Sequence, residues 1–221
     1  MKSSLYAALV DQRRSCHVCQ GLVNPAAIDG ATLDSFHIGP WTQLHGDLNA
    51  ELMIVGQDWG DVAYFRTNRG LDDLRNPTMR TLQELLASIE IDAPMDRYCQ
   101  RSRGVFLTNA ILCLKSGGMQ APVQSAWFNN CGSRFLRRQV ELVRPRAVVP
   151  LGGRAYRALC DAFQVAPQPL RRAVEGNAIE LVPDTLMVPV YHCGNRVLNT
   201  HRSKQLQLVD WQRVRTALGD R

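Results

Sequence analysis

The sequence lacks any segment suited to crossing or entering a membrane. No apolar run approaches the roughly 20 residues that a membrane-spanning helix needs. Near the N-terminus, Asp11, Arg13 and Arg14 interrupt the apolar core that a secretory signal requires. We therefore expect a soluble, cytoplasmic protein with no membrane partner.

Internal repeats, low-complexity tracts and long linkers are also missing. The 221 residues are 45% hydrophobic and 21% charged, which is typical of a packed globular chain. We expect one domain over residues 1–221 and, as the simplest arrangement, a monomer.

The charge is unbalanced towards the basic side. Lys and Arg number 26 against 20 Asp and Glu, a formal net charge of +6. A surplus of this kind fits a phosphate-rich partner, because Lys and Arg contacts supply most of the non-specific affinity for DNA. An ordinary basic surface would explain it equally well.

The seven cysteines do not fit a disulfide framework. Their number is odd, and a chain that is not exported keeps its thiols reduced. Cys16 and Cys19 form a C-x-x-C pair, with Cys113 and Cys131 far downstream. The other three are scattered and are interpreted as structural: Cys99, Cys160 and Cys193.

Short apolar runs alternate with amphipathic stretches along the chain. This alternation predicts an α/β fold, a three-layer αβα arrangement with a central, mostly parallel four-stranded sheet. The expected strands lie at 52–55, 105–112, 147–151 and 186–191. The expected helices lie at 78–90, 135–143, 153–163 and 204–218, with Ser203 as the cap of the last.

Polar residues follow or end three of these strands. Asp58 comes after the first, Asn109 lies in the second, and His192 comes after the last. Ligands of open α/β sheets bind beyond the carboxyl ends of the strands, so we expect the three side chains in one cleft. Taken singly, Asp58 could cap a helix, Asn109 could be a satisfied core amide, and His192 could be structural.

Four segments together resemble the uracil-DNA glycosylase superfamily, from Cys16 to Trp211. IVGQDWG resembles its first catalytic motif: Gly56-Gln57-Asp58 is similar to family one, and the Gly60 end to family four. VFLTNAILC resembles the family-four strand with the uracil-reading Asn. The other two segments that resemble it are RPRAVVPLGGRAYRAL and VPVYHCGNRVLN, which stands at the second catalytic motif.

The resemblance implies a monofunctional DNA glycosylase of base excision repair, acting on DNA that contains uracil. Asp58 would stabilise the oxocarbenium-like sugar and orient water, and His192 would donate to the leaving uracil. Asn109 would read the uracil edge and reject cytosine. Gln57 would also contact uracil, and Phe65, or its neighbour Tyr64, would stack on the flipped base.

The resemblance also assigns DNA contacts, with some departures from the family pattern. Arg196 stands where the superfamily often inserts a side chain into the vacated stack, and Ser203 and Lys204 would contact phosphates. Trp59 replaces the usual Pro, and Gly60 replaces the aromatic that repels the thymine methyl. Cys193-Gly194 replaces Pro-Ser in the second motif.

The spacing of four cysteines is similar to the cluster pattern of family four. The resemblance implies a structural [4Fe-4S] cluster. A tetrahedral zinc ion would use the same ligand set, so the spacing leaves both open. The ligands would be Cys16, Cys19, Cys113 and Cys131.

Three other functions remain open at this point. The altered second motif suits a DNA-binding protein that grips uracil or abasic sites with little turnover. A glycosylase for another deaminated base, such as hypoxanthine, is a further alternative. A small iron–sulfur electron carrier is the last, although it would have no use for Asp58.

Overall fold

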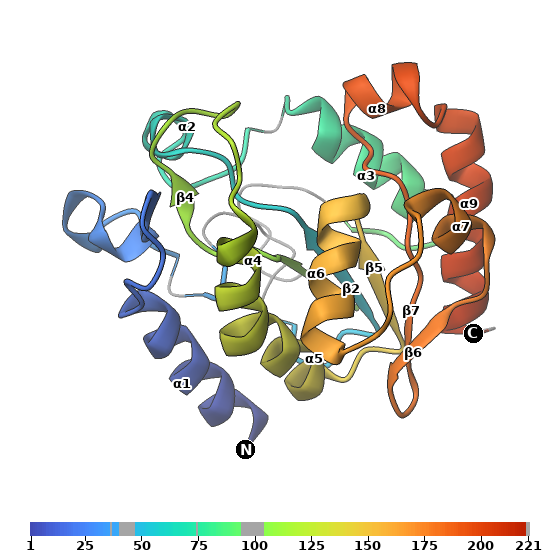
Figure 1. Ribbon diagram of the computed structural model, residues 1–221, viewed down its shortest axis with the longest axis horizontal. Coiled ribbons are helices and arrows are strands. Elements are labelled where there is room, and N and C mark those ends of the chain that lie inside the picture. Colours follow the sequence, from blue (N-terminus) through green and yellow to red (C-terminus); the bar gives the residue numbers. More distant parts are fainter. Residues whose placement is uncertain (36, 40–46, 74, 94–103, 220–221) are drawn as a thin grey trace.

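The computed structural model describes residues 1–35, 37–39, 47–73, 75–93 and 104–219 (Figure 1). Cys99 lies outside these ranges. Within them, no helix is long and apolar enough to span a membrane.

A five-stranded sheet forms the centre of the fold. Its strand order is β3-β2-β5-β7-β6, and every neighbouring pair is parallel except β7 and β6. The four expected strands are present, but the expected count of four was wrong because β6 adds an antiparallel edge strand. The strands are β2 (Leu52–Gly56), β3 (Val105–Asn109), β5 (Ala147–Pro150), β6 (Ile179–Val182) and β7 (Thr185–Met187).

Helices cover both faces of the sheet, which confirms the three-layer αβα architecture. Successive strand residues point to opposite faces. In β2, Met53 and Val55 pack into one core, while Leu52 and Ile54 pack into the other. The first core lies under α1 (Lys2–Arg14), α4 (Ser125–Cys131), α5 (Arg137–Val143), α6 (Gly153–Phe163) and α7 (Leu170–Glu175), and the second under α3 (Pro77–Ala87) and α9 (Lys204–Leu218) (Figure 1).

The helices α6 and α9 have the bounds that the apolar periodicity predicts. Ser203 caps α9, since its side chain accepts a hydrogen bond from the Leu206 N–H. The helix expected at 135–143 belongs to a longer helical segment. That segment joins α4, the π-helical η3 (Gly132–Leu136) and α5.

The remaining elements lie around the carboxyl edge of the sheet and the N-terminal arm. A two-stranded antiparallel ladder joins the arm to the segment after β3. These elements are β1 (Leu22–Val23), η1 (Pro25–Ala27), η2 (Asp29–Ala31), α2 (Val62–Thr67), β4 (Leu114–Lys115) and α8 (Asn195–Thr200).

Candidate active site

A cleft of about 830 Å³ lies at the carboxyl ends of the parallel strands. The segments after β2, β3, β5 and β7 all contribute to its walls. Asp58, Asn109 and His192 line it together, as their places in the sequence predict. The other polar or charged side chains in its lining are Gln57, Tyr64, Asp72, Asn76, Thr78, Lys115, Gln120, Arg154, Asn195 and Arg196.

The Asp58 carboxylate is held by its own loop. Gln57 Nε2 donates to Oδ2 at 2.7 Å, and the backbone N–H of Gly60 donates to Oδ1 at 2.8 Å. Gly60 has a positive φ of 92°, a conformation that glycine adopts without strain. The helix α2 is capped by Asp61, so Asp58 is not needed as a cap.

A buried lysine, which the sequence did not single out, reaches the same carboxylate. Lys115 Nζ lies 3.6 Å from Asp58 Oδ1, and the two side chains are 7% and 8% exposed. Nζ also donates to the backbone carbonyl of Met119 at 2.7 Å. A single lysine near the end of an apolar strand has no pattern that would have marked it.

Asn109 is positioned by the pairing of two strands. Its Cα is the partner of the Gly56 Cα at the ends of β3 and β2, and its side chain is buried. A Cβ on Gly56 would lie 2.0 Å from Asn109 Oδ1. Gly56 therefore leaves the space that the Asn109 amide occupies.

His192 is half-buried in the lining of the same cleft. The backbone N–H of Gly194 donates to His192 Nδ1 at 3.0 Å. Because Nδ1 accepts this bond, a neutral ring carries its proton on Nε2. Burial lowers the pKa of His192 below its ordinary 6.5, and the negative charge of Asp58 offsets part of this effect. The imidazole is thus a neutral donor.

The expectation that Phe65 stacks on the base does not agree with its position in the structure. Its side chain is fully buried in a cluster with Ile28, Trp59 and Leu114, and it does not line the cleft. Its neighbour Tyr64 does line the cleft. Tyr64 Oη donates to Asp72 Oδ1 at 2.6 Å, and burial followed by this bond raises the pKa of Tyr64 to about 12.

The expected DNA contacts divide into two groups. Arg196, in the first turn of α8, is exposed at the cleft. Ser203 and Lys204 do not line it. Ser203 caps α9, and Lys204 forms an ion pair with Glu84.

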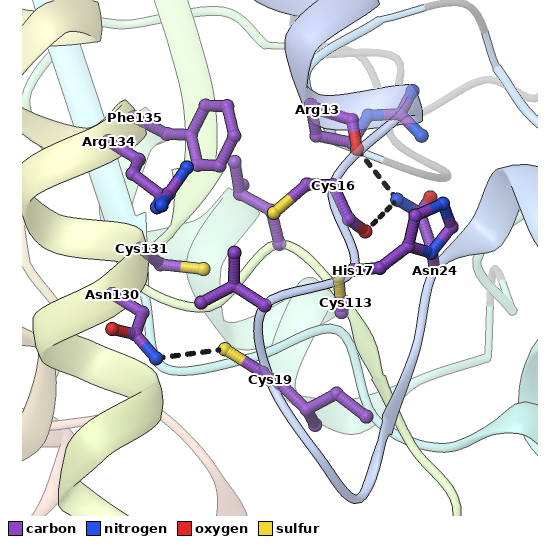
Figure 2. A pocket seen from close by; sticks show the side chains of 13 residues that line it. Arg13, Cys16, His17, Cys19, Asn24, Cys113, Asn130, Cys131, Arg134 and Phe135 are labelled. Carbon is purple, nitrogen blue, oxygen red and sulfur yellow. Dashed lines mark hydrogen bonds between the residues drawn. The ribbon is translucent and has the colours of Figure 1, made fainter.

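The four cysteines singled out above line one separate cavity of about 90 Å³. Cys16 and Cys19 follow α1, Cys113 lies between β3 and β4, and Cys131 ends α4 (Figure 2). All four are free thiols. Across the described ranges, no group of three or more His, Cys, Asp or Glu side chains is arranged to hold a metal ion as it stands.

The cysteine cavity has a distinctive chemical environment. Asn130 Nδ2 donates to Cys19 Sγ at 3.5 Å (Figure 2). Burial, and then the nearby Cys19 and Cys16, raise the pKa of Cys131 to about 12, although a backbone hydrogen bond from Leu112 opposes them. Burial also raises the pKa of Cys113, and the other three cysteines raise it further. The four thiols are therefore close enough to act on one another. Cys160 and Cys193 lie elsewhere in the core.

A comparison with protein families gives one match. The model of the uracil DNA glycosylase superfamily matches residues 44–215. These residues include Asp58, Asn109 and His192 and begin after Cys16 and Cys19. No curated protein matches the chain.

Proposed function

Because the chain belongs to the uracil DNA glycosylase superfamily, whose members are DNA glycosylases, we propose that it removes uracil from DNA by hydrolysis of the N-glycosidic bond. The observation that supports this most directly is the meeting of Asp58, Asn109 and His192 in one cleft, from three separate strand ends. The product would be an abasic site and free uracil.

Asp58 has the chemistry to act on the sugar side of the bond. As the bond lengthens, the sugar becomes cation-like, and a fixed carboxylate stabilises that charge and orients the attacking water. The hydrogen bonds from Gln57 and Gly60 hold the carboxylate before substrate arrives. Such preorganisation avoids reorientation during the reaction.

His192 has the chemistry to act on the base side. The leaving uracil gains negative charge on its oxygen, and Nε2–H of a neutral imidazole can donate to it. The Gly194 N–H keeps Nδ1 as the acceptor, and burial keeps the ring neutral.

Asn109 can select the base. Its amide accepts from the uracil ring N–H and donates to the adjacent carbonyl, whereas cytosine presents the opposite pattern. Extruding the base costs a few kcal/mol of unstacking. Tyr64, which lines the cleft, would offset part of this by stacking on the base. Arg196, which is exposed at the cleft, would fill the vacated stack or hold a phosphate.

A second candidate is a glycosylase for a larger deaminated base such as hypoxanthine. It is favoured by the 830 Å³ cleft and by Gly60 at the position of the thymine-excluding aromatic. A panel of duplexes containing uracil, a thymine mismatch, hypoxanthine or xanthine separates the two. After alkali treatment, we expect the uracil duplex to show strand breaks sooner than the other three duplexes. Tight binding to uracil DNA without base release would instead favour a DNA-binding protein.

We also propose a [4Fe-4S] cluster in the cysteine cavity, held by Cys16, Cys19, Cys113 and Cys131. A single zinc ion needs its thiolates about 2.3 Å from one point. The four thiols surround one cavity of about 90 Å³, and their spacing resembles the cluster pattern of family four, which favours the cluster over zinc. The cluster would join the N-terminal arm to α4 and supply structural support, with no part in the hydrolysis.

The metal content tests the cluster independently of activity. We expect protein purified without oxygen to absorb in the violet and to contain iron and inorganic sulfide. Cys131→Ser should lose both, whereas Cys160→Ser, a buried thiol outside the cavity, should keep them. Colourless protein with one zinc per chain would overturn the iron assignment.

A further inference from the structure

Lys115 is a buried cation that the proposed glycosylase chemistry does not use. Its side chain is 7% exposed, and its ammonium contacts the Asp58 carboxylate and the Met119 carbonyl. Its backbone is also fixed, because its N–H donates to the carbonyl of Gly60 at 2.9 Å. Gly60 in turn donates to Asp58. Lys115 thus contacts the Asp58 loop through both its backbone and its side chain.

The burial of this pair has an energetic consequence. A charge removed from water is costly unless an opposite charge and hydrogen bonds replace the solvent. Asp58 is 8% exposed, and its only cationic partner within ion-pair distance among the described residues is Lys115. Gln57 and Gly60 supply hydrogen bonds but no charge.

The same ammonium joins two walls of the cleft. Asp58 lies on the loop after β2, whereas Met119 lies on the segment after β4, and both line the cleft. A side chain that bonds to both fixes the separation between the acid and this wall.

We propose that Lys115 is the positioning residue of Asp58: it provides the counter-charge of the buried carboxylate and fixes its orientation towards the cleft. This assignment rests on the proposed glycosylase function for its effect on rate. The ion pair itself does not depend on that function. The two parts can therefore be tested separately.

The rate test compares variants that keep or remove the charge. In single-turnover cleavage of a uracil duplex, we expect Lys115→Met to slow base release by about tenfold or more, with DNA affinity nearly unchanged. Lys115→Arg should recover much of the rate. Lys2→Met removes a lysine at the start of α1 and should leave the rate as it is. Equal rates for Lys115→Met and the wild type, or equally poor rates for Met and Arg, would overturn the proposal. So would a borohydride-trapped adduct between DNA and Lys115, which would make it a nucleophile.

The stability test does not require activity. Lys115→Met leaves the Asp58 charge buried without its cation, so we expect a lower Tm. Asp58→Asn together with Lys115→Met removes both charges and should recover most of the loss. If the single variant does not fold and the double variant does, the pairing is supported. If the two substitutions are additive, Lys115 does not act through Asp58. If the two substitutions are coupled in stability but the wild type releases no base, the ion pair is supported and the proposed function is rejected.

Discussion

At the scale of single residues, the cleft combines a carboxylate with a neutral imidazole. Two different devices maintain these states. Asp58 is surrounded by donors, from Gln57, Gly60 and Lys115. His192 accepts a backbone hydrogen bond at Nδ1, and burial lowers its pKa, which favours the neutral ring. The pair is therefore suited to a reaction in which positive charge grows on one side and negative charge on the other.

The state of His192 can be tested by its pH dependence. Burial lowers its pKa below 6.5, so we expect an NMR titration midpoint below that value and a cleavage rate that does not fall between about pH 8 and 6.5. Asp58→Asn should lower the midpoint further, because the carboxylate charge raises it. A midpoint above 6.5 would contradict a neutral donor.

The lowered pKa of His192 also predicts how the free energy of unfolding changes with pH. Below pH 6.5 this histidine is protonated in the unfolded chain, but its lower pKa keeps it neutral in the folded chain. The unfolded state therefore binds more protons. The stability from burying neutral His192 is complete above 6.5 and is lost as the pH falls below it. His37, whose pKa is also lowered by burial, contributes in the same direction. His192→Gln should therefore reduce the acid-side loss without abolishing it.

The residues at strand ends could be predicted from the sequence, whereas their immediate supports could not. Asp58 and His192 follow recognisable strands, and Asn109 ends one. Lys115 became visible only when the chain was folded, because its partner is distant in sequence. The expected stacking role of Phe65 failed for a local reason, because adjacent residues of a helix point about 100° apart. The sequence does not say whether Tyr64 or Phe65 faces the cleft.

At the scale of elements, the register of β2 against β3 decides the geometry of base reading. Gly56 and Asn109 are paired directly, and the amide fills the space above the glycine. A one-residue slip of β3 would turn Asn109 to the other face of the sheet.

Gly56→Ala tests this arrangement. The added methyl would displace the Asn109 amide, so we expect uracil release to fall by about ten- to a hundredfold, as when a buried polar contact is lost. Gly132→Ala is the matched control, since its Cβ would make ordinary contacts of 3.8 Å and more. Its rate should stay close to that of the wild type. Wild-type activity in Gly56→Ala would show that the amide position does not matter.

The elements that the sequence predicted share a strong pattern, and those it missed do not. The helix α6 has a clear apolar stripe that it buries, and α9 begins after a serine cap. The strand β6 is short, partly exposed and at the edge, so its residues show neither a buried run nor a regular alternation. Its place is set by the tight connection to β7.

At the scale of the whole molecule, the net charge of +6 and the exposed Arg196 at the cleft mouth suit a nucleic-acid substrate. Each phosphate contact releases counterions, so affinity for DNA should fall linearly on a logarithmic plot against salt. The topology could be anticipated from the alternation of strands and helices, which also placed the cleft at the carboxyl edge. The cleft's width and the rigid links across it depend on tertiary contacts that no local pattern encodes.

Arg196→Ala tests whether this side chain contacts the DNA backbone. If it does, we expect weaker binding to uracil duplexes and a salt slope reduced by about one. Arg171→Ala removes an exposed arginine of α7 that pairs with Glu175, and it serves as the control. An unchanged slope together with slower cleavage of duplex but not of single-stranded DNA would indicate insertion into the stack instead.

The most direct test of the account is the release of free uracil by the wild type and by Asp58→Asn, measured by chromatography under single-turnover conditions on the same duplex. We predict that the wild type releases uracil and leaves an alkali-labile site, while the isosteric variant binds the DNA but is slower by about a thousandfold. Release at the wild-type rate by Asp58→Asn, or no release by a wild type that binds the duplex tightly, would contradict it.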